Sequence, residues 1–269
     1  MRTVGELLRH WRHRRGVSQL DLALAADVSP RHVSLVETGK SHPSAGMVLR
    51  LAEHLDVPLR ERNRLLLAAG FAPRYAERSL SHGALDAARE AVERVLRAHE
   101  PYPAVAFDRH WDIVRANRAV EPFFAGVAPE LLRPPVNLVR LGLDPRGFAP
   151  LVVNLADVRT VFRARVGRQL AAAPDARLAA LYDELLASGG DGTEGASIAA
   201  GSDVVIPMIL RLGGREVRMF STITTFGTPM DITLDEIAIE LYYPADEESA
   251  AYFETAHHAP ERSGPPNIG

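Results

Sequence analysis

The chain has 269 residues, enough for two domains of ordinary size, one of them with a large buried core. It contains no cysteine, which excludes disulfides, thiolate zinc sites and cysteine nucleophiles. The longest apolar stretches, such as residues 204–210, are too short to cross a bilayer, and residues 1–16 lack the apolar run of a secretory signal. We therefore expect a soluble protein that stays in the cytoplasm.

The net charge of −3 hides an uneven distribution of charge along the chain. Residues 1–80 carry thirteen Lys and Arg against eight Asp and Glu, a balance of +5, which leaves −8 for the remainder. A basic segment can approach a polyphosphate, whereas an acidic one is repelled by it. Because a solvated helical face shows the same imbalance, the charge indicates nucleic-acid binding only beside a motif.

Five helical patterns open the chain, and the first three are bounded by residues that favour a helix end. Gly16 suits the left-handed conformation that terminates a helix, and Ser18 is a typical N-cap for the next one. Ser29 is a second N-cap, with Pro30 at the first helical position behind it. The predicted helices span residues 4–15, 19–26, 30–38, 47–55 and 60–69.

The segment of residues 18–44 reads SQLDLALAADVSPRHVSLVETGKSHPS. It resembles the lambda-repressor-like helix-turn-helix family, the XRE class, over more than twenty residues. Ala23 is the small residue where two helices cross, Val28 plugs the turn, and Glu37 and Gly39 match the closing Glu-x-Gly of that family. The resemblance implies a domain that binds double-stranded DNA with its third helix in the major groove.

The resemblance also assigns contact roles by position. Gln19 and Lys40 match phosphate contacts, and Arg31 suits guanine, the commonest partner of a base-reading arginine. The alternative is that each exposed Arg or His is simply solvated, and the basic cluster of residues 9–15 fits backbone contact and a polar face equally well. The predicted DNA-contacting residues are Gln19, Ser29, Arg31, His32, Ser34, Leu35 and Lys40.

Residues 84–99 form an amphipathic helix with apolar residues at heptad spacing, too short for a coiled coil to be claimed. Two interpretations stay open, a helix packed on the following domain and a connector that forms a dimer or transmits a signal. Pro101 and Pro103 end this predicted helix.

The pattern then changes to that of a sheet. Two short strands joined at Asp108 and Arg109 precede a helix that Asn117 is expected to cap, an order that resembles the opening of PAS-type sensor domains. A three-stranded antiparallel meander with a tight turn at Gly213 and Gly214 follows later. The predicted fold class is α+β in two domains, an all-α five-helix domain and an antiparallel sheet with helices on one face. The predicted strands are 104–107, 111–115, 203–212, 216–226 and 237–243, and the intervening helices are 155–170 and 177–186.

Residues 102–253 resemble the ligand-binding domain of the MmyB-like transcription regulators. Three stretches carry the match: WDIVRANRAVEPFF, NLVRLGLDPRGFAPLVVNLADVR and FSTITTFGTPMDITLDEIAIELYYPAD. One departure is Val158, which stands where a tryptophan is expected. The resemblance implies a PAS-like fold with a pocket for a small apolar molecule such as a fatty acid. The predicted parts are a helix-turn-helix domain at 1–72, a linker at 73–100, a ligand-binding domain at 101–255 and a flexible tail at 256–269.

Aromatic residues of this domain are candidates to line the pocket, and Arg159 or Arg163 to meet a carboxylate. The alternative is that the rings fill a solid core and the arginines are exposed. The predicted ligand-binding residues are Phe107, Trp111, Phe123, Phe124, Arg159, Phe162, Arg163, Phe220 and Tyr243.

No catalytic motif stands out, so we expect neither an enzyme nor a cofactor. His257 and His258 are adjacent in a Pro/Gly-rich terminus and are assigned no metal, and residues 189–201 are predicted to be a loop. Two hypotheses remain: a ligand-responsive, homodimeric transcription regulator, and a DNA-bound regulator whose second domain binds a partner protein or forms a dimer without a small ligand.

Overall fold

The computed structural model describes residues 2–187 and 206–257 and divides into two compact units. Unit 1 consists of Met1–Leu85 and Phe226–Asp235, and unit 2 consists of Asp86–Thr225 and Glu236–Gly269. The predicted loop at 189–201, the start of the strand predicted from 203 and most of the predicted tail lie outside the described residues. The predicted domain boundaries stay predictions.

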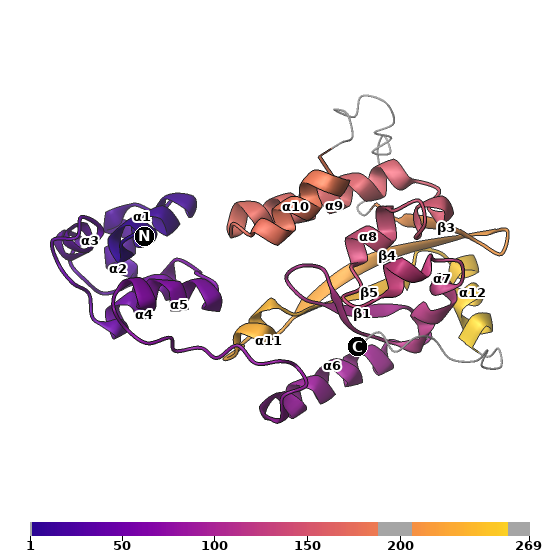
Figure 1. Ribbon diagram of the computed structural model, residues 1–269, viewed down its shortest axis with the longest axis horizontal. Coiled ribbons are helices and arrows are strands. Elements are labelled where there is room, and N and C mark those ends of the chain that lie inside the picture. The colour runs from indigo at the N-terminus through magenta and orange to yellow at the C-terminus, as the bar shows by residue number, and fades with distance from the viewer. Residues whose placement is uncertain (1, 188–205, 258–269) are drawn as a thin grey trace. The chain divides into compact units, whose positions relative to one another are not determined.

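Unit 1 contains the five predicted helices at its N-terminal end, which confirms this part of the fold. Thr3 and Ser18 begin the first two with reciprocal capping boxes, and Ser29 and Ser44 accept backbone N–H groups at two further helix starts. The helices are α1 (Val4–Arg14), α2 (Gln19–Ala25), α3 (Pro30–Glu37), α4 (Ala45–His54) and α5 (Leu59–Ala68) (Figure 1).

Small residues let these helices approach one another closely. Ala23 of α2 is fully buried, as expected for the helix crossing. Gly5 lies where α1 meets the end of α3, and a Cβ atom there would stand 2.3 Å from the carbonyl oxygen of Val36. Any larger residue at position 5 would therefore push α1 away from α3.

Unit 1 also takes in residues 226–235, a segment from far along the chain that ends in the short helix α11 (Ile232–Glu236). Asp231 forms an isolated parallel bridge with Ala76, and its carboxylate lies 2.9 Å from the guanidinium of Arg78. Asp235 accepts the backbone N–H of Leu59 at 3.0 Å. Because Pro58 gives α5 no side-chain cap, a carboxylate 176 residues away in sequence caps this helix.

Unit 2 is built on a five-stranded sheet in the order β2-β1-β5-β4-β3, and every neighbouring pair is antiparallel. Gly213 and Gly214 join β3 to β4 with φ angles of 57° and 82°, values that favour glycine in a tight hairpin turn. The antiparallel sheet of the prediction is confirmed. Its strands are β1 (Ala104–Phe107), β2 (Ile113–Ala116), β3 (Met208–Leu212), β4 (Arg215–Thr225) and β5 (Ala238–Pro244).

Helices cover both faces of this sheet, so the prediction of helices on one face is wrong. All four residues of β1 are buried, although successive side chains of a strand point to opposite faces. Figure 1 shows α6 on one side of the sheet and α8, α9 and α10 on the other. The helices are α6 (Asp86–Ala98), α7 (Glu121–Phe124), α8 (Leu138–Leu143), α9 (Leu155–Ala172), α10 (Ala176–Leu185) and α12 (Glu247–His257), with 3₁₀ turns η1 (Gly83–Leu85), η2 (Arg118–Val120), η3 (Pro129–Leu132) and η4 (Ala149–Leu151).

The amphipathic helix α6 packs on β1 and β2 through Val92 and Leu96, both buried, which favours the interpretation of a packed helix. Asn117 differs from its predicted role, because its side chain makes no helix-capping hydrogen bond. Its oxygen accepts the N–H of Ala104 at 3.0 Å, and its amide donates to the carbonyls of Leu96 and Tyr102. Asn117 thus ties the end of α6 to the start of β1.

Within residues 2–187 and 206–257, no helix is both long enough and apolar enough to cross a membrane.

Candidate DNA-binding surface and ligand pocket

A buried ion pair holds α3 in unit 1. Both nitrogens on one edge of the Arg12 guanidinium donate to Glu37, at 2.7 and 2.9 Å, and the Gln19 amide donates to the same carboxylate at 2.8 Å. Arg12 also donates to the carbonyl of Val17. These contacts join α1, the start of α2 and the end of α3, so they fix the position of the third helix.

Burial alone raises the pKa of the Glu37 carboxyl, since it penalises the charged form. The hydrogen bonds from Arg12 and Gln19 and the charge of Arg12 outweigh burial, so the net pKa lies below its ordinary value. The carboxylate is therefore ionised near neutral pH, with both oxygens satisfied.

The structure separates the basic residues of α1, which the sequence left as one group. Arg12 is buried in the ion pair with Glu37. Arg15 donates to the carbonyls of Leu55 and Asp56 and lies over the ring of Trp11, and Arg14 lies over the same ring at 5.1 Å. Three members of the cluster thus have partners within unit 1.

The predicted base-reading residues lie at the start and along the outer side of α3. Ser29 is the N-cap of α3: its hydroxyl oxygen accepts the N–H of His32 at 3.1 Å, and its O–H group can still donate to a phosphate. Arg31 and Lys40 are exposed. Half-buried are His32, Ser34 and Leu35.

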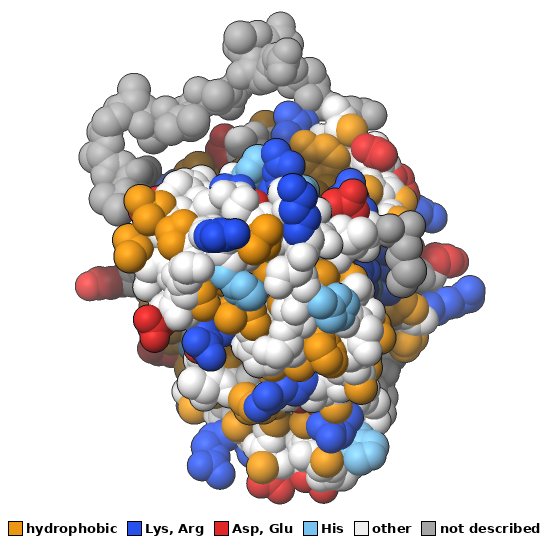
Figure 2. Space-filling model, turned by 90° about the vertical axis from the view of Figure 1, so that its left-hand side faces the viewer, with side chains coloured by type: hydrophobic (Ala, Val, Ile, Leu, Met, Phe, Trp, Pro, Cys, Tyr) orange, Lys and Arg blue, Asp and Glu red, His pale blue; other side chains and the backbone are white. Residues whose placement is uncertain are grey.

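Figure 2 views the molecule from the side on which α3 lies in Figure 1. Blue Lys and Arg side chains and pale blue His side chains are visible among neutral and hydrophobic ones on the side turned to the viewer. Exposed positive charge suits the approach of a phosphate backbone.

Unit 2 contains a small pocket, partly open to solvent, between α9 and the sheet. Four polar residues share it: Arg165, Ser221, Glu240 and Tyr242. Its apolar lining consists of Val158, Val161, Phe162, Ile206, Pro207, Met208, Met219 and Phe220.

Glu240 is the most buried of the polar residues in the pocket, at 2% exposure. Arg165 and Ser221 both donate to its Oε1, at 2.7 and 2.5 Å. Burial raises the pKa of the Tyr242 hydroxyl well above its ordinary value, and the nearby Glu240 charge raises it further. Tyr242 therefore stays neutral and keeps its proton.

Comparison with protein families gives two matches along the chain. Residues 3–65 match a helix-turn-helix domain, and residues 88–256 match the MmyB-like transcription regulator ligand binding domain. The chain belongs to the MmyB-like transcription regulators. It is a helix-turn-helix transcription regulator, and the resemblance found in its sequence is confirmed.

Two solved structures are similar to this MmyB-like regulator. The clp gene regulator ClgR from Corynebacterium glutamicum is 28% identical, with 36% of this chain and 90% of that chain covered and a TM-score of 0.22. An RNA-binding light-oxygen-voltage receptor is 12% identical, with coverage of 94% and 61% and a TM-score of 0.27. No curated protein matches the chain.

The predicted ligand residues of the MmyB-like domain do not come together in the pocket, which contains two of them, Phe162 and Phe220. Phe107 and Trp111 stack on each other at 4.8 Å inside the core, and Phe123 and Phe124 are buried there as well. Tyr243 stacks on Phe220 at 5.3 Å, outside the pocket lining. Most of these rings therefore match the alternative of a solid core.

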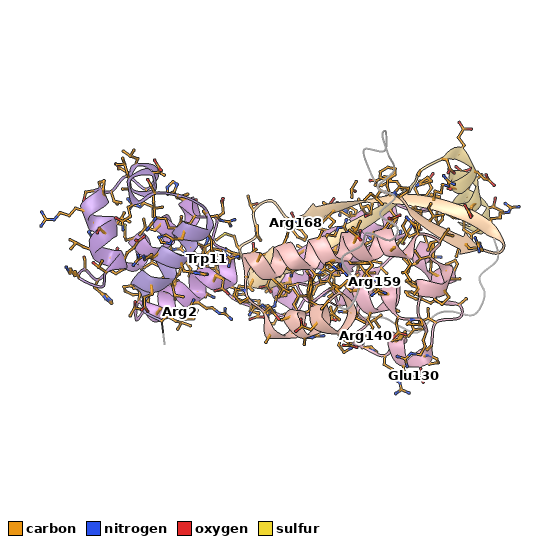
Figure 3. The ribbon with its side chains drawn as sticks, turned by 90° about the horizontal axis from the view of Figure 1, so that it is seen from above. Arg2, Trp11, Glu130, Arg140, Arg159 and Arg168 are labelled. Carbon is orange, nitrogen blue, oxygen red and sulfur yellow. The ribbon has the colours of Figure 1, made fainter. Side chains whose placement is uncertain are left out.

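The two arginines expected to meet a carboxylate bind the end of a helix instead. Arg159, labelled on α9 in Figure 3, donates to the carbonyl of Leu185, and Arg163 donates to that of Leu186. They satisfy carbonyl groups at the C-terminal end of α10, where a positive charge is favourable. The pocket arginine is Arg165, which sequence reasoning missed although it lies two residues from Arg163.

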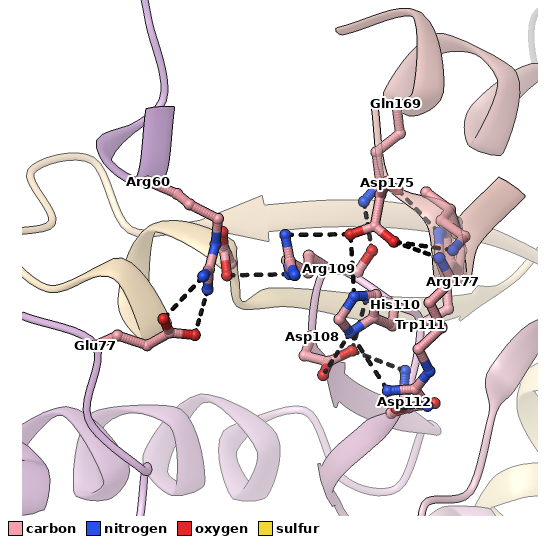
Figure 4. A network of polar contacts seen from close by, with 12 residues as sticks. Arg60, Glu77, Asp108, Arg109, His110, Trp111, Asp112, Gln169, Asp175 and Arg177 are labelled. Carbon is pink, nitrogen blue, oxygen red and sulfur yellow. Dashed lines mark hydrogen bonds and ion pairs between the residues drawn. The ribbon is translucent and has the colours of Figure 1, made fainter. Parts of the chain in front are cut away.

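A polar network near the turn between β1 and β2 contains a group of three potential metal ligands, Asp108, His110 and Asp112 (Figure 4). Arg177 and Asn137 donate to Asp112, and His110 lies 3.1 Å from Asp175. Protein groups already occupy these polar atoms, so a structural role accounts for the cluster.

Proposed function

We propose that the protein is a sequence-specific regulator that binds an operator as a homodimer. Two copies of α3 would enter successive major grooves, about 34 Å apart on B-form DNA. Arg31 would read a base, with His32, Ser34 and Leu35 beside it, while Gln19, Ser29 and Lys40 would position the phosphate backbone.

The observation that carries this proposal is the rigid placement of α3. The Arg12–Glu37–Gln19 contacts hold the end of the helix, whereas Arg31 near its start is exposed. A helix fixed at its base with an exposed basic side chain suits insertion into a groove.

We further propose that unit 2 binds a small, largely apolar ligand, with a fatty acid as one candidate, and that the ligand changes operator affinity. The mostly apolar pocket with a few polar groups supports this, because small-molecule sites have that character. A ligand changes affinity only by binding one arrangement of the dimer better than another. We propose no enzymatic activity, and we place the protein in the cytoplasm, where its operator lies.

Selection of operator sites from random duplex DNA with the full chain tests the DNA-binding proposal. We expect enrichment of a two-fold symmetric site whose half-sites lie about one helical turn, or a multiple of it, apart. Absence of enrichment at low salt would overturn sequence-specific binding, and a single unpaired site would overturn the dimer.

Mass spectrometry of a solvent extract, alongside the native mass of the protein, tests the ligand proposal. A stoichiometric apolar compound in the extract supports a sensor. A chain that neither carries nor takes up such compounds supports the second candidate, a unit 2 that binds a partner protein or forms a dimer without a ligand.

A further inference from the structure

One oxygen of the buried pocket glutamate has no hydrogen-bond partner within residues 2–187 and 206–257. Oε1 of Glu240 accepts from Arg165 and Ser221, but Oε2 has none among the described residues, although the side chain is only 3% exposed. A buried acceptor without a partner is rare in folded proteins, because the loss of its water is not compensated.

This glutamate lies at the polar end of the pocket. Glu240 and Tyr242 are two residues apart on β5 and so share one face of the sheet, and Ser221 pairs directly with Tyr242 from β4. All three line the pocket together with Arg165 of α9. The unpartnered oxygen thus belongs to a site that also has apolar walls.

The charge in this site is already balanced, because Arg165 neutralises Glu240 at 2.7 Å. A ligand carboxylate would place a second negative charge beside the unpartnered oxygen, and an ammonium group would place a second positive charge beside Arg165. Both would bury a net charge, which is costly. A neutral O–H or N–H group satisfies the oxygen without adding charge.

We propose that this pocket binds a small molecule with an apolar body and a neutral hydrogen-bond donor, an alcohol or an amide, which donates to Oε2 of Glu240. The free fatty acid is then the disfavoured form of the same ligand. The inference rests on the proposed function of unit 2 as a small-molecule sensor and specifies the head group that it selects.

The test uses the full chain and four eight-carbon probes with the same apolar tail: 1-octanol, octanamide, octanoate and octylamine. Dissociation constants are measured by calorimetry at pH 7.5, where the acid and the amine are charged. We expect the alcohol and the amide to bind about tenfold more tightly than either charged probe, the factor that one additional good hydrogen bond provides.

The variant Glu240→Gln tests the role of the carboxylate. It removes the negative charge and leaves Arg165 without its counter-charge, so octanoate is expected to overtake 1-octanol. Arg159→Gln is the control: it removes one charge from α9, the helix that lines the pocket, but the Arg159 guanidinium binds the carbonyl of Leu185 outside the pocket lining, so the wild-type order of the probes is expected to persist.

Three results would overturn the inference: octanoate binding as tightly as 1-octanol to the wild type, no binding of any probe, or a preference for the alcohol that survives Glu240→Gln in a folded variant. If Glu240→Gln does not fold, the dissociation constants of the four probes for the wild type alone still test the inference. Operator binding by the same preparations separates the two proposals. A wild-type protein that binds no operator would overturn the DNA-binding function, whereas the head-group preference measured with the four probes would still stand.

Discussion

Glu37 in unit 1 and Glu240 in unit 2 are both buried glutamates paired with an arginine, and they differ in how far their oxygens are satisfied. Glu37 accepts from both sides, with two bonds from Arg12 and one from Gln19. Glu240 has one oxygen shared by Arg165 and Ser221 and one without a partner in the part of the chain that the structure describes.

The difference separates a structural ion pair from a binding group. A carboxylate whose hydrogen bonds are complete holds helices together and has no capacity for a ligand. A carboxylate that keeps a free acceptor in a pocket retains interaction energy for another molecule. The contrast predicts that the same substitution, Glu to Gln, lowers stability much more in unit 1 than in unit 2.

The largest effect is expected from Glu37→Gln. The substitution leaves Arg12 buried without its counter-charge, and we expect the free energy of unfolding of unit 1 to fall by about 3–5 kcal/mol, as when one partner of a buried pair is removed. Glu240→Gln should cost less, about 1–3 kcal/mol, because only one of its oxygens is bonded within the described residues and Arg165 keeps 20% of its side chain exposed.

Urea denaturation measures both changes, because the chain has two tryptophans, Trp11 in unit 1 and Trp111 in unit 2. Fluorescence in a Trp111→Phe background reports on unit 1, and in a Trp11→Phe background on unit 2. Equal losses for Glu37→Gln and Glu240→Gln would contradict the comparison.

Next in size is the effect of Arg31→Ala on operator binding. If Arg31 reads a base, its loss weakens binding by about 1–3 kcal/mol and relaxes sequence preference at one position. Lys40→Ala, a loss of charge at a predicted phosphate contact, should instead weaken binding to all sequences and lower the dependence on salt. Binding assays over several salt concentrations distinguish the two; identical, sequence-independent losses would rule out the assignment of Arg31.

A smaller effect is expected for Asp235→Ala, which removes the cap from α5. Loss of an N-cap carboxylate costs about 0.5–2 kcal/mol, so the melting temperature of unit 1 should fall while the pocket keeps its ligand preference. The control is Asp157→Ala, which removes a first-turn carboxylate from α9 in unit 2 and should leave the melting temperature of unit 1 unchanged. An unchanged melting temperature for the Asp235 variant would show that the contact adds no stability.

The smallest effect of Glu37 is expected in the pH dependence of the free energy of unfolding, because other carboxylates titrate in the same range. The pKa of Glu37 is lowered in the folded state, so its contribution is present above the ordinary value of 4.5 and is lost as the pH falls through the folded pKa. The stability difference between wild type and Glu37→Gln should therefore shrink at acidic pH. A difference that is constant from pH 7 to pH 3 would contradict this linkage.

Sequence was informative where spacing along one element determines the structure. The caps Ser18 and Ser29, the turn at Gly213 and the burial of Ala23 follow from local rules, and all are present. The helix-turn-helix motif likewise fixes which side of α3 is exposed.

The pocket was less predictable, because it depends on which residues of distant elements face one another. Arg163 and Arg165 are near neighbours in sequence, yet one binds the end of α10 and the other Glu240. Glu240 lies within the strand predicted at 237–243 and was not among the predicted ligand-binding residues. A charged residue in the middle of an otherwise apolar strand was the available signal, since burying it requires a partner.

The ten residues that unit 1 draws from between β4 and β5 bear on how its parts can be exchanged. A fragment ending at residue 85 would lack both the carboxylate that caps α5 and the one that pairs with Arg78. A chimera that takes its helix-turn-helix unit from another family member must therefore take two segments of chain, the N-terminal helices and the segment between β4 and β5. Otherwise the N–H group at the start of α5 and the guanidinium of Arg78 lose their acceptors.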